Sequence, residues 1–503
     1  MINIPNKVII LGGGTAGWMA ANLLMNRWSD HGIKIEVIES PQIGIIGVGE
    51  GSTPQLKSFF DTLGISEEEW MPKCNATFKH GIRFNDWSAH LGFESYFHSF
   101  PAKTDRDTAR AFVYNTFLRR QGLNVQSLPD YYFLPAYLAE QVLGPHATEN
   151  FPFPSSYGYH FDSYLLGDFL KQKAIECGVD YTQDEIQDAL LNEYGDISDL
   201  QGVNGHRYVA DFYIDATGFD SVLLQQKTGV GFDNFSSNLF NDRAVVLPSR
   251  HPNLNELKPQ TVATAMKFGW RWAIPLTNRI GNGYVFSSAY CSEDQAEQEL
   301  RRALGLLESD IQARHLKMRV GQVRQHWSNN CLGVGLSQGF IEPLEATALH
   351  LVQTTLEQFI EAIEARQSIE VVRDEFNRRI VSRFEGIRDY IVCHYKVNSR
   401  VDTDYWRSAR EDITISGSLE SILQVWDSNG DLSEEIDRQR IGAYYSSLSW
   451  HSLLAGYGRF RTFDSLNSND ERIARFPLES VIDFNRRCAM NFSNHTDQLW
   501  RPS

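Results

Sequence analysis

The first part of the chain alternates between short apolar runs and helical patterns. Residues 7–11 (KVIIL) form an apolar run that ends in glycines, which predicts a buried strand. Residues 15–24 carry apolar positions at helical spacing, and residues 33–39 (IKIEVIE) predict a second strand. A strand, a helix and a strand in this order are typical of a βαβ unit with parallel strands.

Further along the chain the pattern changes from strands to helices. Residues 77–84 (TFKHGIRF) alternate and predict one strand, residues 161–177 predict a helix, and residues 213–218 predict a strand that ends in a tight turn. Residues 243–290 are rich in strand-like runs. From Ala348 onward, apolar residues recur at helical spacing over most of the remaining chain.

This order predicts the domain organisation. The chain has 503 residues and shows no internal repeat, low-complexity tract or obvious linker. We therefore expect a nucleotide-binding domain over residues 1–347, with a β-rich region inserted at about residues 235–300. Residues 348–503 are expected to form a mainly helical region that covers the substrate.

The glycines after the first strand predict a dinucleotide site. Gly12–Gly17 fits the pattern G-x-G-x-x-G between a strand and a helix. Gly12 permits the tight turn, Gly14 lets a pyrophosphate approach the backbone, and Gly17 allows the helix to pack closely on the strand. The helix start at Thr15 and Ala16 donates N–H groups to phosphate. Glu39 ends the second strand, where an acidic side chain accepts hydrogen bonds from ribose hydroxyls.

A second motif favours FAD as the dinucleotide. Residues 211–219 (DFYIDATGF), with Asp215 and Gly218, resemble the A-T-G turn of FAD-dependent oxidoreductases. The sequence shows no second G-x-G-x-x-G that would hold a nicotinamide nucleotide. Reducing power is therefore expected to arrive from outside the protein.

Composition narrows the class of protein further. The formal net charge is −16, and such a surface repels phosphate backbones, so we expect no nucleic-acid partner. The six cysteines are widely spaced and form no metal or disulfide pattern. We expect no metal site, no membrane span and a cytoplasmic location.

One motif points to a different chemistry. Residues 335–339 (GLSQG) fit G-x-S-x-G, the nucleophile elbow of α/β-hydrolases. In an elbow a helix begins directly after the serine, whereas here the next helical pattern starts near Ala346. The sequence also offers no persuasive triad in the order Ser, Asp, His. The hydrolase hypothesis on Ser337 is therefore weak.

Several segments together resemble the flavin-dependent halogenases of the tryptophan-halogenase type. The FAD fingerprint is followed by residues 47–54 (GVGEGSTP) and by residues 270–275 (WRWAIP), which carry the W-x-W-x-I-P signature. Further matches run in the family's order over about 400 residues. They are FKHGIRF around Lys79, YHFDSYLLGDFL at 159–170, NCLGVGLSQGFIEPLEAT at 330–347 and DTDYWR at 402–407.

The resemblance implies a fold and a reaction. The fold would be α/β: an FAD-binding Rossmann-like domain of the glutathione-reductase type with an inserted β-sheet and a mainly helical C-terminal part. A separate NAD(P)H-dependent flavin reductase would supply reduced FAD, whose reaction with O2 oxidises halide to hypohalous acid. That oxidant would travel to a lysine beside a small aromatic substrate and halogenate it. The oligomeric state stays open, with a dimer as one option.

Two residues match the family's catalytic pair. Lys79 matches the lysine, and alternation in residues 77–84 puts it opposite Phe78, Ile82 and Phe84. If that face is also covered, burial favours a neutral amine or a hydrogen-bond donor for the hypohalous acid. Glu345 matches the glutamate, which would orient the oxidant and accept the proton of the ring.

The same turn carries the expected halide site. The resemblance assigns halide to the backbone N–H groups of Thr347 and Ala348, which suits the anion preference of a helix start. The family typically reads E-S-T-G where this chain has EATA at 345–348. Alanine at position 348 would cost about 1–2 kcal/mol if the backbone there is left-handed. Halide preference therefore stays open, and bromide is the safer assay.

The remaining expected site residues are implied by position in the family motifs. Trp270 and Trp272 would form a wall between flavin and substrate, and Trp450, with Tyr444 and Tyr445, could sandwich an indole. The further cofactor contacts are expected at Gly49, Glu50, Gly335 and Leu336.

The substrate and two alternative functions stay open. The substrate is expected to be tryptophan, a simpler indole or a phenol. A single-component FAD hydroxylase would share the cofactor but oxidise NAD(P)H unaided, and a non-catalytic flavin-binding protein would have no need for Lys79 and Glu345 together.

Overall fold

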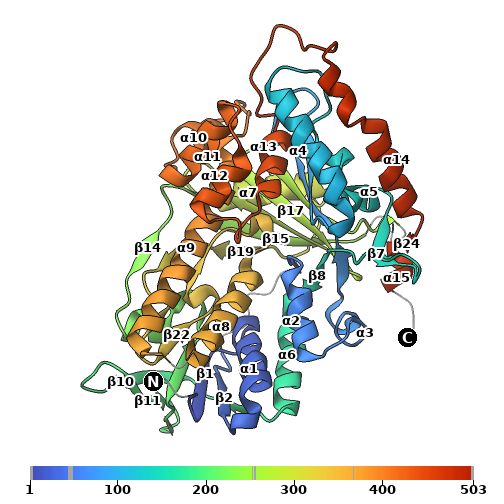
Figure 1. Ribbon diagram of the computed structural model, residues 1–503. Coiled ribbons are helices and arrows are strands. Elements are labelled where there is room, and N and C mark those ends of the chain that lie inside the picture. Colours follow the sequence, from blue (N-terminus) through green and yellow to red (C-terminus); the bar gives the residue numbers. More distant parts are fainter. Residues whose placement is uncertain (1–3, 43–48, 252, 254–255, 366, 500–503) are drawn as a thin grey trace. The chain divides into compact units, whose positions relative to one another are not determined.

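The computed structural model describes residues 4–42, 49–251, 253, 256–365 and 367–499. The chain divides into two compact units, each built from three segments (Figure 1). Unit 1 comprises Met1–Ala76, Phe161–Ser236 and Met318–Glu385, and unit 2 comprises Thr77–His160, Ser237–Lys317 and Gly386–Ser503. The predicted border between residues 347 and 348 lies within unit 1, and the predicted division into a cofactor-binding and a substrate-covering region stays a prediction.

Unit 1 is built on a six-stranded sheet with the order β21-β22-β13-β1-β2-β9. Its strands are β1 (Lys7–Leu11), β2 (Lys34–Glu39), β9 (Asp180–Gln183), β13 (Phe212–Asp215), β21 (Trp327–Ser328) and β22 (Cys331–Gly333). The strands from β22 to β9 run parallel, and β21 pairs antiparallel with β22. The predicted βαβ unit is confirmed, because α1 (Thr15–Trp28) connects the parallel strands β1 and β2.

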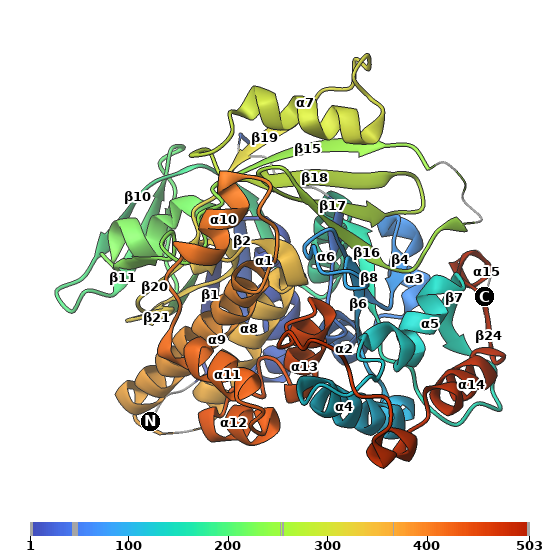
Figure 2. The same ribbon diagram turned by 90° about the horizontal axis from the view of Figure 1, so that it is seen from above.

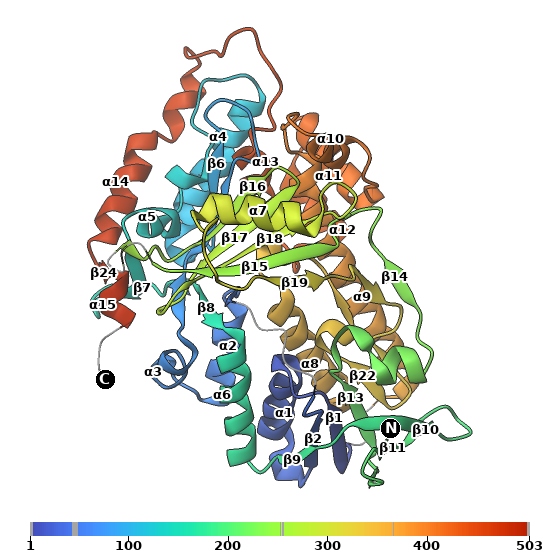
Figure 3. The same cartoon turned by 180° about the vertical axis from the view of Figure 1, so that it is seen from behind.

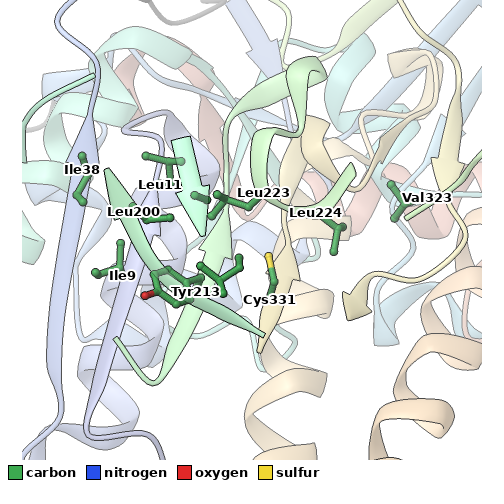
Figure 4. Close-up of a cluster of buried hydrophobic side chains, with 11 residues drawn as sticks. Ile9, Leu11, Ile38, Leu200, Tyr213, Leu223, Leu224, Val323 and Cys331 are labelled. Carbon is green, nitrogen blue, oxygen red and sulfur yellow. The ribbon is translucent and has the colours of Figure 1, made fainter. Parts of the chain in front are cut away.

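Helices cover one face of this sheet and a small sheet covers the other. Helices α1, α6 (Ser163–Glu176) and α8 (Ala348–Glu364) lie side by side (Figure 1). On the other face, Leu200 from the small sheet packs with Ile9, Leu11 and Tyr213 (Figure 4). Strands β10 (Ile186–Leu191), β11 (Ile197–Gly202) and β12 (Arg207–Tyr208) form that small sheet. Apolar residues on both faces explain why β1 is an uninterrupted apolar run.

Shorter elements complete unit 1. They are β3 (Gly49–Gly51), α2 (Gln55–Leu63), α3 (Glu67–Trp70), β14 (Phe232–Asn234), β20 (Gly321–Val323), β23 (Gly339–Phe340) and the first part of α9 (Ile369–Lys396). Residues 47 and 48 of the GVGEGSTP motif lie outside the described residues.

Unit 2 contains a seven-stranded sheet with the order β19-β15-β18-β17-β16-β5-β6 (Figure 2). Its strands are β5 (Gly81–Asn85), β6 (Ser95–Ser99), β15 (Arg243–Ser249), β16 (Thr261–Met266), β17 (Gly269–Pro275), β18 (Ile280–Phe286) and β19 (Arg314–Lys317). Helix α7 (Glu293–Leu304) lies along this sheet (Figure 3), where Ala296 and Leu300 pack against Val245 and Tyr284. Four of the seven strands, β15 to β18, come from the region predicted to be rich in strands.

The other elements of unit 2 are mostly helical. They are β4 (Thr77–Lys79), α4 (Arg106–Arg120), α5 (Leu134–Glu140), β7 (Leu143–Ala147), β8 (Gly158–Asp162, of which 158–160 belong to unit 2), α10 (Asp404–Glu411), α11 (Gly417–Asp427), α12 (Leu432–Gln439), α13 (Ser447–Gly456), α14 (Leu478–Ala489), β24 (Phe492–Asn494) and α15 (His495–Leu499). Among the described residues, no helix is long and apolar enough to cross a membrane.

The prediction of one strand over residues 77–84 is wrong. This segment forms β4 and β5, which belong to different sheets, so Phe78 does not share a face with Ile82 and Phe84. The break falls at His80, whose N–H donates to the carbonyl oxygen of Pro259 (2.8 Å). Position 81 then has to be glycine, because a Cβ there would lie 2.2 Å from the carbonyl oxygen of His98.

We expect Gly17→Ala to destabilise the protein by about 3 kcal/mol. A Cβ at position 17 would lie 2.1 Å from the carbonyl oxygen of Gly12, which sits in a rigid turn. Gly14→Ala is the matched control, because a Cβ there meets nothing within 4 Å, and it should cost less than about 1 kcal/mol. Urea unfolding measures both, and equal losses would contradict this packing argument.

Candidate active site

The turn after β1 has the shape that the glycine pattern predicts. Gly12 has φ +116°, and a Cβ there would lie 2.3 Å from the carbonyl oxygen of Ala216. Gly14 directly precedes α1 and faces open space. Within the described residues, the N–H groups of Thr15 and Ala16 make no backbone hydrogen bond. The turn therefore offers donors and room to a phosphate, which is the fit that a dinucleotide requires.

The acidic residue at the end of β2 lies beside this turn. A Cβ at Gly13 would lie 2.4 Å from Cδ of Glu39, so the carboxylate rests against the glycine backbone. One of its oxygens, Oε2, accepts hydrogen bonds from Tyr181 Oη (2.8 Å) and Lys171 Nζ (3.2 Å). These bonds fix the carboxylate where the ribose contact was predicted.

Two further predicted segments reach the same edge of the unit 1 sheet. Gly335 has φ +64°, and a Cβ there would lie 2.7 Å from Cβ of Ala16. Asp215 ends β13 and is fully buried, and its carboxylate accepts hydrogen bonds from Thr217 and from the backbone of Leu223. The carboxylate thus holds the turn before Gly218, so a contact of Asp215 with the cofactor would be indirect.

The hydrolase hypothesis is wrong for Ser337. Its side chain is fully buried, and its hydroxyl donates to Asp215 Oδ1 (3.0 Å). Residues Gly335–Ser337 form a 3-10 turn, and Leu336 within it is half-buried. A nucleophile elbow would expose the serine above a helix start. This serine instead connects its own 3-10 turn to the turn after β13, through the hydrogen bond to Asp215.

Glu50 carries an unusual proton affinity. It lies on β3 between two glycines and is half-buried. Burial raises the pKa of Glu50, a hydrogen bond with Ser163 lowers it, and the negative charge of Asp162 raises it again, so that the pKa lies at about 7. The predicted cofactor contact at Gly49 and Glu50 therefore includes a carboxyl group that changes charge near neutral pH.

The expected halide turn ends at a well-defined helix start. Glu345 is buried at the end of the 3-10 turn Pro343–Glu345, and α8 begins at Ala348. The first hydrogen bond of the helix runs from Leu351 N–H to the carbonyl oxygen of Thr347 (2.9 Å). Within the described residues, the N–H groups of Thr347 and Ala348 make no backbone hydrogen bond. These donors suit an anion.

The left-handed residue in this turn is Ala346 and not Ala348. Ala346 has φ +55°, while Ala348 is helical. The strain of an alanine in this conformation, about 1–2 kcal/mol, therefore falls one residue after Glu345. The concern that alanine at position 348 strains the halide turn is removed.

Lys79 is completely buried in unit 2. It ends β4, and its Nζ lies 5.3 Å from the centre of the Phe100 ring. The predicted condition, that the face carrying this lysine is covered, is therefore met. The aromatic face is a favourable contact for an ammonium group.

Three tryptophans expected near the substrate are also buried in unit 2. Trp270 and Trp272 share one face of β17, with ring centres 6.0 Å apart. Trp450 on α13 packs edge-on against Tyr390, with ring centres 4.8 Å apart. Tyr445 stacks on the same Tyr390 at 3.5 Å, so this face of Tyr445 is closed to a substrate ring.

Several residues around Lys79 could not be predicted from the sequence. Phe100 and His495 belong to none of the matched motifs, and His160 lies in the segment 159–170 but was given no role there. Only the fold brings all three to β4. A histidine count gives no signal, because the chain has 14 of them.

The comparisons with known proteins decide the family. Residues 7–468 match the family described as tryptophan halogenase. The 7-chloro-L-tryptophan 6-halogenase of Kutzneria sp. (strain 744) is 34% identical, in an alignment that covers 98% of this chain and 99% of that protein. The chain belongs to the tryptophan halogenase family.

Solved structures of halogenases agree with the assignment of this chain to the family. The tryptophan 6-halogenase of Streptomyces toxytricini has a TM-score of 0.82 and 31% identity, with 99% of each chain covered. A flavin-dependent halogenase from Brevundimonas sp. BAL3 has a TM-score of 0.81 and 28% identity, again with 99% of each chain covered. The predicted family, the predicted α/β fold class and the predicted enzyme class, a flavin-dependent halogenase, are confirmed. This match over nearly the whole chain favours the halogenase over the single-component hydroxylase.

We expect Glu50→Gln to change how the halogenase's stability depends on pH. A folded-state pKa of about 7 lies above the ordinary value of 4.5, so the stability linked to the neutral carboxyl group is present below about pH 4.5. It is lost as pH rises through about 7. The variant should therefore gain on the parent protein between pH 5 and pH 8, by on the order of 1–2 kcal/mol after allowing for solvent screening.

Urea unfolding of both proteins at pH 5, 6, 7 and 8 measures this gain. Glu68→Gln, at an exposed carboxylate of unit 1, is the matched control for the loss of one negative charge, and the gain of Glu50→Gln is measured relative to it. A flat difference for Glu50→Gln relative to this control would show that this carboxyl group is not perturbed.

Proposed function

We propose that this halogenase transfers an oxidised halogen to an electron-rich aromatic substrate, with an indole such as tryptophan as the first choice. The observation that carries the proposal is the fully buried Lys79, whose Nζ lies over the ring of Phe100 in a member of the tryptophan halogenase family. Relatives named for halogenation of tryptophan at positions 6 and 7 support an indole substrate.

The cofactor in this proposal is FAD in its reduced form. The open space at Gly14, the N–H groups at the start of α1 and the carboxylate of Glu39 suit its pyrophosphate and ribose. Gly218, Gly335 and the other predicted contacts in unit 1 would complete the cradle. When bound, reduced FAD supplies the reaction of O2 that oxidises halide to hypohalous acid. A separate NAD(P)H-dependent flavin reductase would keep the cofactor reduced.

Each proposed site residue has a defined chemical task. The N–H groups of Thr347 and Ala348 would bind the halide ion by charge–dipole attraction. Trp270 and Trp272 would form a dry wall, and Trp450 would contact the substrate ring. Water exclusion matters because hypohalous acid reacts with any exposed nucleophile.

Lys79 and Glu345 would handle the protons of the transfer. The ammonium group of Lys79 would donate a hydrogen bond to the oxygen of hypohalous acid. The bond between oxygen and halogen then breaks as the ring carbon takes the halogen, and the oxygen leaves as water with the proton from Lys79. Glu345 would accept the proton that the ring carbon loses, which restores aromaticity.

One incubation tests the function. The halogenase, a flavin reductase, FAD, NADH and bromide are mixed with tryptophan, other indoles and phenols. We expect a brominated indole, identified by the two-line isotope pattern of bromine in mass spectrometry, and no product when the reductase is omitted. Substantial NADH consumption without the reductase would favour the aromatic hydroxylase instead.

A substitution tests the role of Lys79. Lys79→Met keeps the apolar stem in its buried position but removes the amine, so halogenated product should fall by about a hundredfold or more. Reoxidation of reduced FAD should continue, because the lysine acts after that step. Lys103→Met, at an exposed lysine of unit 2, is the matched control. Normal product yield from Lys79→Met would refute the assignment.

A further inference from the structure

Strand β4, which carries Lys79, contacts two buried histidines, one through the side chain of Thr77 and one through the backbone of Phe78. One edge pairs antiparallel with β8, where Thr77 lies opposite His160 and Lys79 lies opposite Gly158. In the middle of β4, the backbone N–H of Phe78 donates to Nε2 of His495 (3.2 Å). His160 and His495 are both fully buried. An imidazole from α15 thus takes the place of a neighbouring strand.

Hydrogen bonds fix the proton of the His160 ring. The Thr77 hydroxyl lies 2.6 Å from the carbonyl oxygen of Pro275, which can only accept, so Thr77 donates its one proton there. His160 Nδ1, 3.0 Å from the same hydroxyl, must therefore carry a hydrogen and donate. Nε2 is then an acceptor for the hydroxyl of Thr261 (2.9 Å). Burial, together with the charge of Lys79, lowers the pKa of His160 well below its ordinary range.

The same reasoning fixes the proton of His495. Its Nδ1 lies 2.7 Å from the carbonyl oxygen of Leu257, so Nδ1 carries the hydrogen. Nε2 of the neutral ring then has a lone pair, and this is the atom that accepts the N–H of Phe78. Burial lowers the pKa of His495 to about 4, so the ring stays an acceptor at neutral pH.

The support behind His495 is itself anchored. The N–H of His495 donates to the carbonyl oxygen of Val142 (2.9 Å), the residue directly before β7. Gln498, one turn along α15, accepts from the N–H of His146 (2.9 Å) and donates to its carbonyl oxygen (2.9 Å). The imidazole is therefore presented by a segment that is fixed to β7, and it is not a loose surface group.

We propose that His495 is a positioning residue for Lys79. The inference rests on the proposed function, because it concerns the lysine that would hold hypohalous acid. Lys79 directly follows the amide that His495 holds, so freedom in this peptide would displace the lysine side chain. Loss of the anchor should leave flavin chemistry intact but let the oxidant escape before it reaches the substrate.

Two isosteric substitutions separate the role of each imidazole nitrogen. His495→Gln places an amide oxygen near the position of Nε2 and can still accept the N–H of Phe78. His495→Asn retains a donor for the carbonyl oxygen of Leu257 but has no atom at the position of Nε2. His495→Gln therefore keeps the hydrogen bond to the Phe78 N–H, whereas His495→Asn removes only that bond.

The first readout does not depend on activity. Hydrogen exchange of the Phe78 amide in the whole protein, followed by mass spectrometry of the peptide that contains it, should accelerate about tenfold or more in His495→Asn. The rate should stay near that of the parent protein in His495→Gln. An unchanged rate in His495→Asn would overturn the anchor, and accelerated exchange across the whole protein in both variants would reduce His495 to a general structural role.

The second readout is the ratio of halogenated product to reduced FAD consumed. It should fall severalfold in His495→Asn, with the lost oxidant recovered by a dissolved hypohalite trap, and His495→Gln should restore it. A normal ratio despite fast exchange at Phe78 would overturn the positioning role. Absence of product and of trapped oxidant from the parent protein would refute the proposed function, while the exchange experiment would still test the anchor.

Discussion

The complete burial of the Lys79 side chain constrains the structure around β4. An ammonium group at this position would lose several kcal/mol of hydration, and the contact with the Phe100 ring would return part of that. Other positive charges must therefore be kept away. The histidines around β4 meet this condition, because burial lowers the pKa of His80 to about 3 and that of His495 to about 4. These neutral histidines form hydrogen bonds around β4 without placing a second positive charge beside Lys79.

The two units contribute different chemistry. Unit 1 presents two helix starts, after Gly14 and after Thr347, whose first N–H groups make no backbone hydrogen bond within the described residues. Both starts therefore suit anions. Unit 2 contributes a buried lysine and packed aromatic rings instead. This division follows from topology, because parallel strands collect helix starts at one edge of a sheet and antiparallel strands supply continuous aromatic faces.

Local signals predicted the parts of the structure that depend on neighbouring residues. The turn Gly12–Gly17, the strands on either side of α1 and the shared face of Trp270 and Trp272 all follow from spacing within a few residues. The break at His80 could not be predicted, because it depends on Pro259 and His98, which the fold brings from elsewhere in the sequence. The sequence also could not predict which ring nitrogen of His160 and of His495 carries the hydrogen. These hydrogen positions are set by the carbonyl oxygens of Pro275 and Leu257, which lie far from the histidines in sequence.

The left-handed residue Ala346 determines what the following helix can bind. Had the helix run unbroken from Pro343, each N–H of Thr347 and Ala348 would have met a carbonyl group four residues earlier and would have been consumed within the helix itself. The reversal at Ala346 separates the 3-10 turn from α8 and withholds those carbonyl groups. A small amount of backbone strain at Ala346 thus leaves the N–H groups of Thr347 and Ala348 available to a ligand.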